Sequence, residues 1–241
     1  MKTLNKMRFI SLQTTLLTLA ILAVPNTCIA SQQRVIANHR FSVLAGTTIT
    51  NTGRTIISED VGLFPGTALT GQKSLSLYGN AHLADAVANV AKSDLVNSYD
   101  GGDTSILAAC IPTELGGKTL THGKYDSDSG TFGITGTLTL DAKGDPNAYF
   151  IFNTASTLIT ATGSNVKLIN GANPNNVIWK VGSSATLETY SHFEGRIFAL
   201  TSITVNTGAT VRGQLLARNG AVTLDNNTIT SGMKSLNHAK Q

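Results

Sequence analysis

Charged, aromatic and covalently reactive side chains are all scarce in this chain of 241 residues. Asp, Glu, Lys and Arg make up only 13% of it, aromatic residues 6%, and there are two cysteines. Soluble domains usually carry a higher density of charge on their surfaces. We therefore expect part of this surface to meet something other than bulk water.

The first thirty residues have the pattern of a secretory signal peptide. Three cations precede an apolar run over residues 9–24, which is short for a membrane span, and small residues precede Ser31. We expect residues 1–30 to be removed and 31–241 to form one secreted, extracellular domain. A lipoprotein anchored through Cys28 is a weaker alternative, because residues 25–27 lack the apolar and small side chains expected before such a cysteine. An uncleaved N-terminal anchor is another.

Charge and cysteine content exclude several functions for the remaining chain. The leader holds three of the 18 Lys and Arg residues and none of the 14 Asp and Glu residues, which leaves a net charge of +1. A nearly neutral chain without a basic cluster offers no electrostatic basis for binding nucleic acid or an anionic membrane. Cys110 is then the only cysteine, so no intrachain disulfide can form, and we expect it to be a small buried hydrophobe in preference to a reactive thiol.

The segment from Val177 to Thr230 contains one apolar pattern written three times. Its copies begin at Val177, Arg196 and Gln214, with spacings of 19 and 18 residues, and an earlier copy over 145–152 matches 173–180 at an offset of 28. Such repeats are too short for helical hairpins and lack helical periodicity. They suit one coil of a β-solenoid, with three strands of about five residues at roughly 3.3 Å per residue.

One segment has a different pattern of apolar residues, which predicts an α-helix over about residues 80–99. Apolar residues recur there at helical spacing, and two glycines follow at 101 and 102. The apolar positions are Leu83, Val87, Val90, Ala91 and Leu95. This narrow stripe would pack along a flat sheet face. The irregular segment over about 103–117 is expected to cap one end of the solenoid.

A second repeat, polar in character, falls between the apolar rungs. Its copies are Thr162-Gly163-Ser164-Asn165, Thr189-Tyr190-Ser191-His192, Thr207-Gly208-Ala209-Thr210, the shorter Asn226-Asn227-Thr228 and, near the N-terminus, Thr52-Gly53-Arg54-Thr55. Stacked coils turn such a repeat into a ladder with about 4.7–4.9 Å between rungs. Strand alternation predicts another outward column of Thr186, Thr204 and Thr223. The sequence leaves open which of the two columns matters for function.

Several long segments resemble the secreted ice-binding (antifreeze) proteins of cold-adapted microbes. The segments are Phe41–Gly53, Val61–Gly66, Ala148–Phe152 and Leu216–Ile229, and the likeness covers nearly all of Arg40 to Thr230. The resemblance implies a mostly β fold, a right-handed parallel β-solenoid of triangular section with one long α-helix packed along a face. It also implies coils stacked out of sequence order, with the N-terminal coil beside the C-terminal one.

The same resemblance implies adsorption to ice through a flat, helix-free face bearing a Thr-Ala/Gly-x-Thr/Asn motif. That motif matches the copies at Thr52, Thr162 and Thr207, whereas the copy at Thr189 departs from it and only Thr137 fits in the segment 134–137. The candidate ice-binding residues are Thr52, Thr55, Thr137, Thr162, Asn165, Thr189, Thr207, Thr210, Asn226, Thr228, Thr186, Thr204 and Thr223. The expected partner is the ice crystal surface, with no cofactor, metal, nucleic acid or membrane, and the expected state is a monomer.

Two other functions compete with this interpretation. Many β-solenoids cleave acidic polysaccharides, which requires clustered carboxylates, but Glu188, Glu194 and Asp225 show no recurring pairing, and the histidines lack metal-ligand spacing. The sequence therefore predicts a protein that is not an enzyme. A non-enzymatic surface adhesin or matrix protein would use the same solenoid as a spacer, and this alternative stays open.

Overall fold

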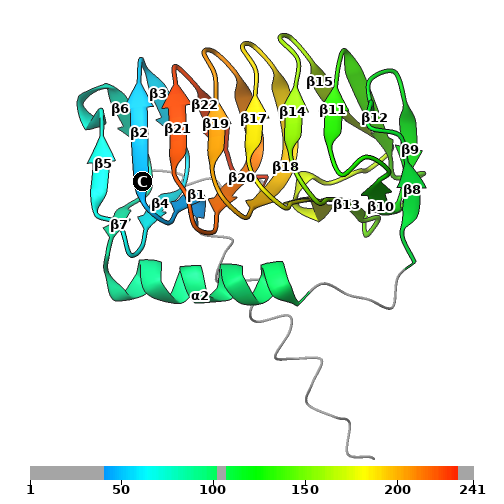
Figure 1. Ribbon diagram of the computed structural model, residues 1–241. Coiled ribbons are helices and arrows are strands. Elements are labelled where there is room, and N and C mark those ends of the chain that lie inside the picture. Colours follow the sequence, from blue (N-terminus) through cyan, green and yellow to red (C-terminus); the bar gives the residue numbers. More distant parts are fainter. Residues whose placement is uncertain (1–40, 102–106, 233–241) are drawn as a thin grey trace, which may run out of the picture.

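The computed structural model describes residues 41–101 and 107–232, and in this part every strand pairing is parallel. The strands form a 15-stranded sheet and a seven-stranded sheet, which together wind into a stack of three-sided coils with one long helix beside them (Figure 1). The fold is thus the predicted β-solenoid. The leader at 1–30 and the tail after residue 232 lie outside the described residues.

Each side of the solenoid is a row of short strands. The seven-stranded sheet, turned toward the viewer in Figure 1 and called the front face here, consists of β11 (Phe132–Ile134), β14 (Leu158–Thr160), β17 (Ala185–Leu187), β19 (Ile203–Val205), β21 (Val222–Asp225), β2 (Thr48–Thr52) and β5 (Ala68–Thr70).

The larger sheet folds over the two other sides. The helix face contains β8 (Ala109–Ile111), β10 (Gly123–Ser127), β13 (Phe150–Thr154), β16 (Val177–Val181), the second halves of β18 (His192–Ala199) and β20 (Thr210–Ala217), β1 (Phe41–Ala45), β4 (Asp60–Leu63) and β7 (Ala81–Leu83). The back face contains β9 (Thr119–Thr121), β12 (Thr137–Asp141), β15 (Asn165–Ile169), the first halves of β18 and β20, β22 (Thr228–Thr230), β3 (Thr55–Ile57) and β6 (Leu75–Leu77). Short 3₁₀ turns lie at Gln72–Ser74 and Pro174–Asn176.

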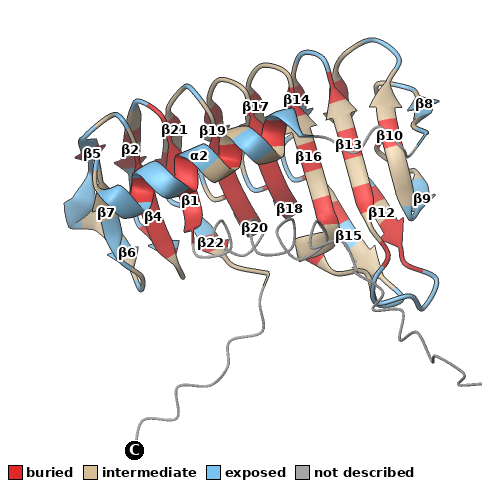
Figure 2. Cartoon of the chain, turned by 90° about the horizontal axis from the view of Figure 1, so that it is seen from below, coloured by how far each residue is buried: buried red, intermediate tan, exposed pale blue. Residues whose placement is uncertain are grey.

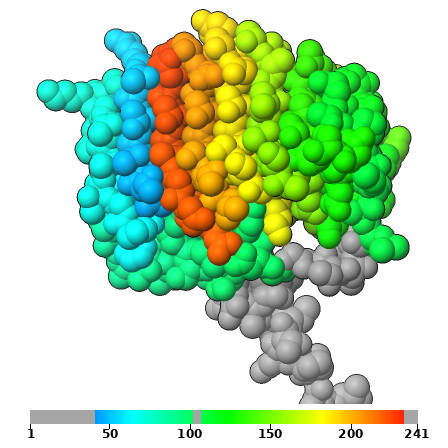
Figure 3. Space-filling view, viewed as in Figure 1, coloured from blue at the N-terminus to red at the C-terminus, as the bar shows by residue number. Residues whose placement is uncertain are grey.

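The coils are stacked out of sequence order, as the family resemblance implied. Strand β1 pairs with β20, β2 with β21, and β3 with β22, so the N-terminal strands lie against the C-terminal ones. In Figure 3 the blue N-terminal coil accordingly lies beside the red C-terminal one. One coil is therefore made from both ends of the described chain, because β21 and β22 supply two of its sides and β1 supplies the third.

The register of the apolar repeat differs by one residue from the alignment drawn on the sequence. Ile178, not Val177, pairs with Arg196, and Val177 pairs with Phe150, which gives offsets of 18 and 27 in place of 19 and 28. The reason is alternation, since a shift of one residue would turn every inward side chain outward. Trp179 and Ile197 both point into the core only in the observed register.

Aromatic rings from successive coils stack inside the solenoid. Phe152 lies 4.0 Å from Trp179 with an interplanar angle of 11°, and Tyr125 and Phe193 extend the stack at either end with centroid distances of 5.3 and 5.2 Å. Trp179 is buried, and its indole N–H donates to the carbonyl of Glu194 at 3.1 Å. These stacked rings fill the core and help to hold adjacent coils in one register.

The helix, α2, runs from Ala86 to Asp100, so the predicted start at residue 80 is wrong. The preceding residues form β7, Ala84 has a left-handed φ of 52°, and Asp85 caps the helix by accepting from the Ala88 N–H at 2.8 Å. The local backbone and the cap therefore decide where the helix begins. Val87 and Val90, both assigned to the packed stripe by sequence periodicity, are instead 40% and 58% exposed.

Helix α2 lies along the helix face and covers a second, smaller apolar cluster (Figure 2). From the helix come Ala91, Leu95 and Tyr99, and from the sheet come Phe41, Leu44, Phe198 and Leu216. The buried Lys92 ammonium donates to the carbonyls of Ala217 and Arg218, and burial, with a smaller effect of Arg218, lowers its pKa to about 8. Both contacts fix the helix to the sheet.

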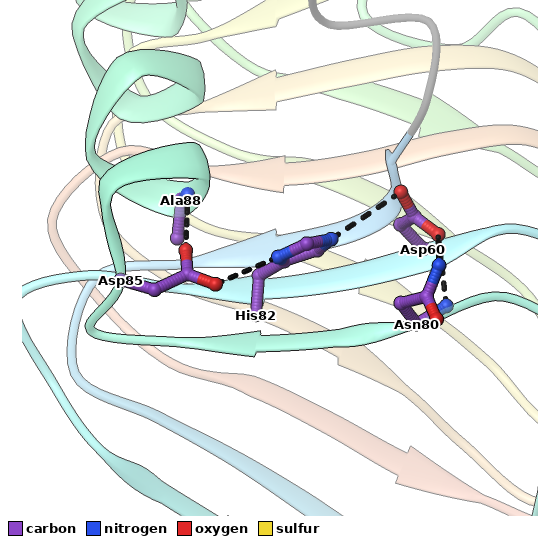
Figure 4. A network of polar contacts seen from close by, with 5 residues as sticks. All are labelled: Asp60, Asn80, His82, Asp85 and Ala88. Carbon is purple, nitrogen blue, oxygen red and sulfur yellow. Dashed lines mark hydrogen bonds and ion pairs between the residues drawn. The ribbon is translucent and has the colours of Figure 1, made fainter.

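A polar network joins the start of the helix to the neighbouring coil (Figure 4). The His82 ring lies between two carboxylates, with Nδ1 at 2.7 Å from Asp85 Oδ2 and Nε2 at 3.6 Å from Asp60 Oδ2. The hydrogen bond from the Ala88 backbone N–H holds the pKa of Asp85 below its usual range, and the hydrogen bond with His82 lowers it further. Asp60 in turn accepts from the Asn80 N–H at 2.8 Å.

Two expectations about the region after the helix have different outcomes. Cys110 is a free cysteine on strand β8 and is exposed, so its predicted burial is wrong. Strand β8 lies at the edge of the described sheet, where it pairs with β10. Residues 102–106, at the start of the predicted cap, lie outside the described residues. Further along, Glu114 accepts from the backbone N–H groups of Gly116 and Thr135 at 2.6 and 2.8 Å, next to the end of the front sheet.

Leu95→Ala should destabilise the protein by about 2–5 kcal/mol, because it leaves a cavity between helix and sheet. Val90→Ala is the matched control, since Val90 lies on the same helix but is 58% exposed; its effect should stay within about 0.5 kcal/mol. Urea unfolding of the two variants measures both values. Equal effects would mean that the helix is not packed through Leu95.

Asp85→Ala should lower the thermal unfolding midpoint at neutral pH, because it removes the helix cap. The folded-state pKa of Asp85 is lowered, so its contribution is present above the unfolded-state pKa and is lost as the pH falls through the folded-state pKa. The difference between variant and wild type should therefore shrink in acid. Melting curves at a series of pH values test this, and a gap that stays constant down to strongly acidic pH would contradict it.

Candidate functional site

Two faces of the solenoid are free of the helix, and the polar repeat lies at the corner between them. In the copy that begins at Thr207, Gly208 has a left-handed φ of 71°, Ala209 is fully buried, and Thr210 is the first residue of β20. Gly163 and Gly53 have φ values of 66°. The glycine thus turns the chain from the front face onto the back face.

This turn places the two ends of each motif on different faces. Thr52, Thr162, Thr189, Thr207 and Asn226 lie along the front rim of the corner, at or beside its left-handed residues. Thr137, Asn165, Thr210 and Thr228 instead form one column on the back face, together with His192. The motif ladder expected as one surface is therefore two separate rows.

Thr55 does not belong to either row, which corrects its assignment as an ice-binding residue. It is fully buried, and its hydroxyl accepts from the Asn227 backbone N–H at 3.1 Å. Ile56 takes the outward position, because it pairs with Thr228. Thr52 pairs with Asp225, which lies level with Asn206 and not with Thr207, so this copy of the motif begins one residue earlier in its coil and its fourth residue falls in the core.

The centre of the front face carries an uninterrupted column of threonines. Thr186 pairs with Thr204, Thr204 with Thr223, Thr223 with Thr50, and Thr50 with Thr70. Ile159 and then Gly133 continue the column in the remaining coils. Sequence analysis found three of the five threonines and missed Thr50 and Thr70, because these come from the N-terminal coils. Alternation within β2 and β5 was the signal that could have revealed them.

Small side chains also flank this column on its helix side. The residues two positions earlier are Thr131, Thr157, Ser184, Ser202, Ala221, Thr48 and Ala68. With strand pairs about 4.8 Å apart and outward residues about 6.6 Å apart along a strand, the two columns form a regular grid. Figure 3 shows this face as one broad surface that crosses all the coils.

The back face has a different character, because charged and long side chains project from it. Beside its column of Thr, Asn and His lies a second row that contains Lys167, Glu194 and Arg212. Arg212 Nε lies 2.7 Å from Glu194 Oε2, and burial raises the pKa of Glu194 although Arg212 opposes the shift. A surface of this kind holds water around its charges and is less flat.

A buried asparagine holds the corner beside the front face. Asn227 Nδ2 donates to the carbonyls of Asn206 and Ala209 at 2.8 and 3.1 Å, and Oδ1 accepts from the Asp225 N–H at 2.6 Å. Asn227 is 1% exposed. Its buried amide therefore satisfies backbone groups of two adjacent coils.

Asn227→Leu should destabilise the protein by roughly 3 kcal/mol or more, because it leaves several buried backbone groups without partners. Asn226→Gly is the control, since Asn226 is the exposed neighbour with a left-handed φ of 54°, and glycine adopts that conformation without strain. Chemical denaturation of both variants tests the prediction. A stable Asn227→Leu variant would show that the corner does not depend on this amide.

The described residues lack two features that would indicate other functions. In residues 41–101 and 107–232, no group of three or more His, Cys, Asp or Glu side chains is placed to hold a metal ion. Within the same residues, the structure contains no helix with the length and apolar character needed to span a bilayer. The cavity between α2 and the corner at Asn219, about 290 Å³, is lined by Phe64, Lys92 and Val96 among others.

Comparisons with known proteins point in one direction. A family model described as Ice-binding-like matches residues 43–230. An ice-binding protein of Nostoc sp. (strain HG1) is 44% identical over 198 residues, which cover 79% of this chain and 71% of that protein. Ice-binding protein 1 of Shewanella frigidimarina (strain NCIMB 400) is 33% identical over 242 residues, which cover 86% of this chain but 27% of that longer protein.

Solved structures agree with the sequence comparison. The crystal structure of an ice-binding protein from the Antarctic ascomycete Antarctomyces psychrotrophicus is similar, with a TM-score of 0.79 and 40% identity, and the match covers 83% of this chain and 98% of that one. An ice-binding protein from an Antarctic biological consortium has a TM-score of 0.78 and 41% identity, covering 92% of this chain and 96% of that one.

Proposed function

The chain belongs to the Ice-binding-like family, and from this premise we propose that the front face is the surface through which it adsorbs to ice. It is an ice-binding protein, not an enzyme. Adsorbed molecules pin the crystal surface, and the protein thereby inhibits ice growth and recrystallisation. The observation that carries the assignment of the face is the column of five threonines on adjacent rungs, from Thr186 to Thr70.

Threonine suits this role because each side chain combines two kinds of contact. Its hydroxyl can anchor a water molecule, while its methyl group favours an ordered local cage of waters. The stiff χ1 of a β-branched residue keeps both groups aimed in one direction. On a rigid sheet the individual contacts are weak but already ordered, so little conformational entropy is lost when the surface meets ice.

The front face meets these requirements better than the back face. Its central column has no charged side chain, whereas the second row of the back face contains the Arg212–Glu194 ion pair. Rim residues Thr52, Thr162, Thr189, Thr207 and Asn226 extend the front surface to the corner. Thr137, Asn165, Thr210 and Thr228 lie on the other side of that corner and take no part in the proposed contact.

The same proposal includes the location and the oligomeric state of the protein. The N-terminal pattern supports export, so that residues 31–241 act as a monomer outside the cell, where ice forms. Neither nucleic acid nor a membrane is a partner.

Replacing Thr204 and Thr223 together with Tyr should abolish thermal hysteresis and inhibition of recrystallisation, because two bulky rings would break the flat grid. Tyrosine is favourable on exposed strands, so the fold should survive. The matched control is Thr210→Tyr with Thr228→Tyr, an equivalent pair on adjacent rungs of the back face, which should keep activity. Circular dichroism and melting curves confirm folding of both variants.

Either of two results would contradict the assignment of the face. Full activity in the Thr204 and Thr223 variant would exclude the front face. Loss of activity only in the Thr210 and Thr228 variant would move the ice-binding surface to the back face.

A further inference from the structure

Two carboxylates lie at the rim of the front face, where charge is otherwise almost absent. The residues that follow the central column toward the corner are Glu188, Asn206, Asp225 and Thr52, since Leu187 pairs with Val205, Val205 with Leu224, and Thr52 with Asp225. A free carboxylate orients water around itself and would oppose an ordered, ice-like layer. Their position therefore needs a physical explanation.

Each carboxylate accepts a hydrogen bond from a polar side chain of an adjacent coil. Glu188 Oε2 accepts from Asn206 Nδ2 at 2.9 Å, and Asp225 Oδ2 accepts from the Thr207 hydroxyl. Each bond joins residues 18 positions apart, which is one coil. The hydrogen bonds thus run along the rim, from rung to rung, in the direction of the threonine column.

Backbone hydrogen bonds hold both Asp225 and Glu188 in place, independently of their side-chain partners. The Asp225 N–H donates to Asn227 Oδ1 at 2.6 Å, and the Asp225 carbonyl accepts from the Gly208 N–H at 3.2 Å. Likewise the Glu188 N–H donates to Thr160 Oγ1 at 2.9 Å. A carboxylate on such a fixed backbone can select one rotamer for its partner on the adjacent coil.

We propose that Asp225 and Glu188 are positioning residues for ice binding, which hold the Thr207 hydroxyl and the Asn206 amide in fixed orientations at the edge of the front face. This inference rests on the proposed function of that face. Thr207 is an exposed residue, and when its hydroxyl proton is donated to Asp225, the lone pairs of the oxygen are held in one arrangement. The rim then presents ordered acceptors in line with the threonines, and its side-chain entropy is lost on folding, not on adsorption.

The test separates the hydrogen bond from the charge. Asp225→Ala removes the acceptor and should reduce thermal hysteresis by about twofold or more at equal concentration, because Thr207 becomes free to rotate. Asp225→Asn keeps an amide oxygen in the same place and should restore most of the activity. Thr207→Val removes the donor but keeps the branched shape, and it should lose activity like Asp225→Ala. Glu188→Ala and Glu188→Gln repeat the comparison on the neighbouring pair.

The outcomes distinguish this inference from the assignment of the face. Unchanged activity in Asp225→Ala, when the Thr204 and Thr223 variant is inactive, would overturn the positioning role and leave the face standing. Equal losses in the Ala and Asn variants would also overturn it, because charge rather than a positioned acceptor would then matter. Activity that survives in the Thr204 and Thr223 variant contradicts the face itself. Unfolding midpoints of all variants show whether a loss reflects misfolding.

Discussion

In-register parallel pairing between coils is the constraint on which the rest of this structure depends. It places Trp179 over Phe152 inside the solenoid and Thr204 beside Thr223 outside it. The same register decides which side chains enter the core and which face outward, because a shift of a single residue would exchange the two sets. A regular surface is therefore obtained from the same pairing that stabilises the core.

The outward side chains of the three faces differ in chemical character. The helix face buries its apolar outer residues under α2, with Leu95 against the sheet and Lys92 bonded to the carbonyls of Ala217 and Arg218. The back face carries the Glu194–Arg212 ion pair and other hydrated side chains. The front face carries no Asp, Glu, Lys or Arg in its central column, and this is the basis for proposing it as the ice-binding surface.

Much of this fold could be predicted from the sequence, and the errors have identifiable causes. Repeats of strand length with Gly and Asn turns indicated coils, and the resemblance supplied the helix face and the stacking order. The start of α2 was placed too early because periodicity does not register the left-handed Ala84 or the cap at Asp85. Cys110 was expected to be buried because free cysteines usually are. The sequence does not reveal that Cys110 lies on an edge strand, where its side chain is exposed.

Strand alternation and turn residues are local properties, so the sequence alone predicts that this chain forms β-coils with outward threonines. It could not determine which threonines share a surface. The polar motif looked like one ladder, yet the left-handed turn at Gly208 separates Thr207 from Thr210 and Thr55 is buried. Only the tertiary structure placed Thr50 beside Thr223, and Thr70 beside Thr50, since the pairing of β2 with β21 joins segments from opposite ends of the chain.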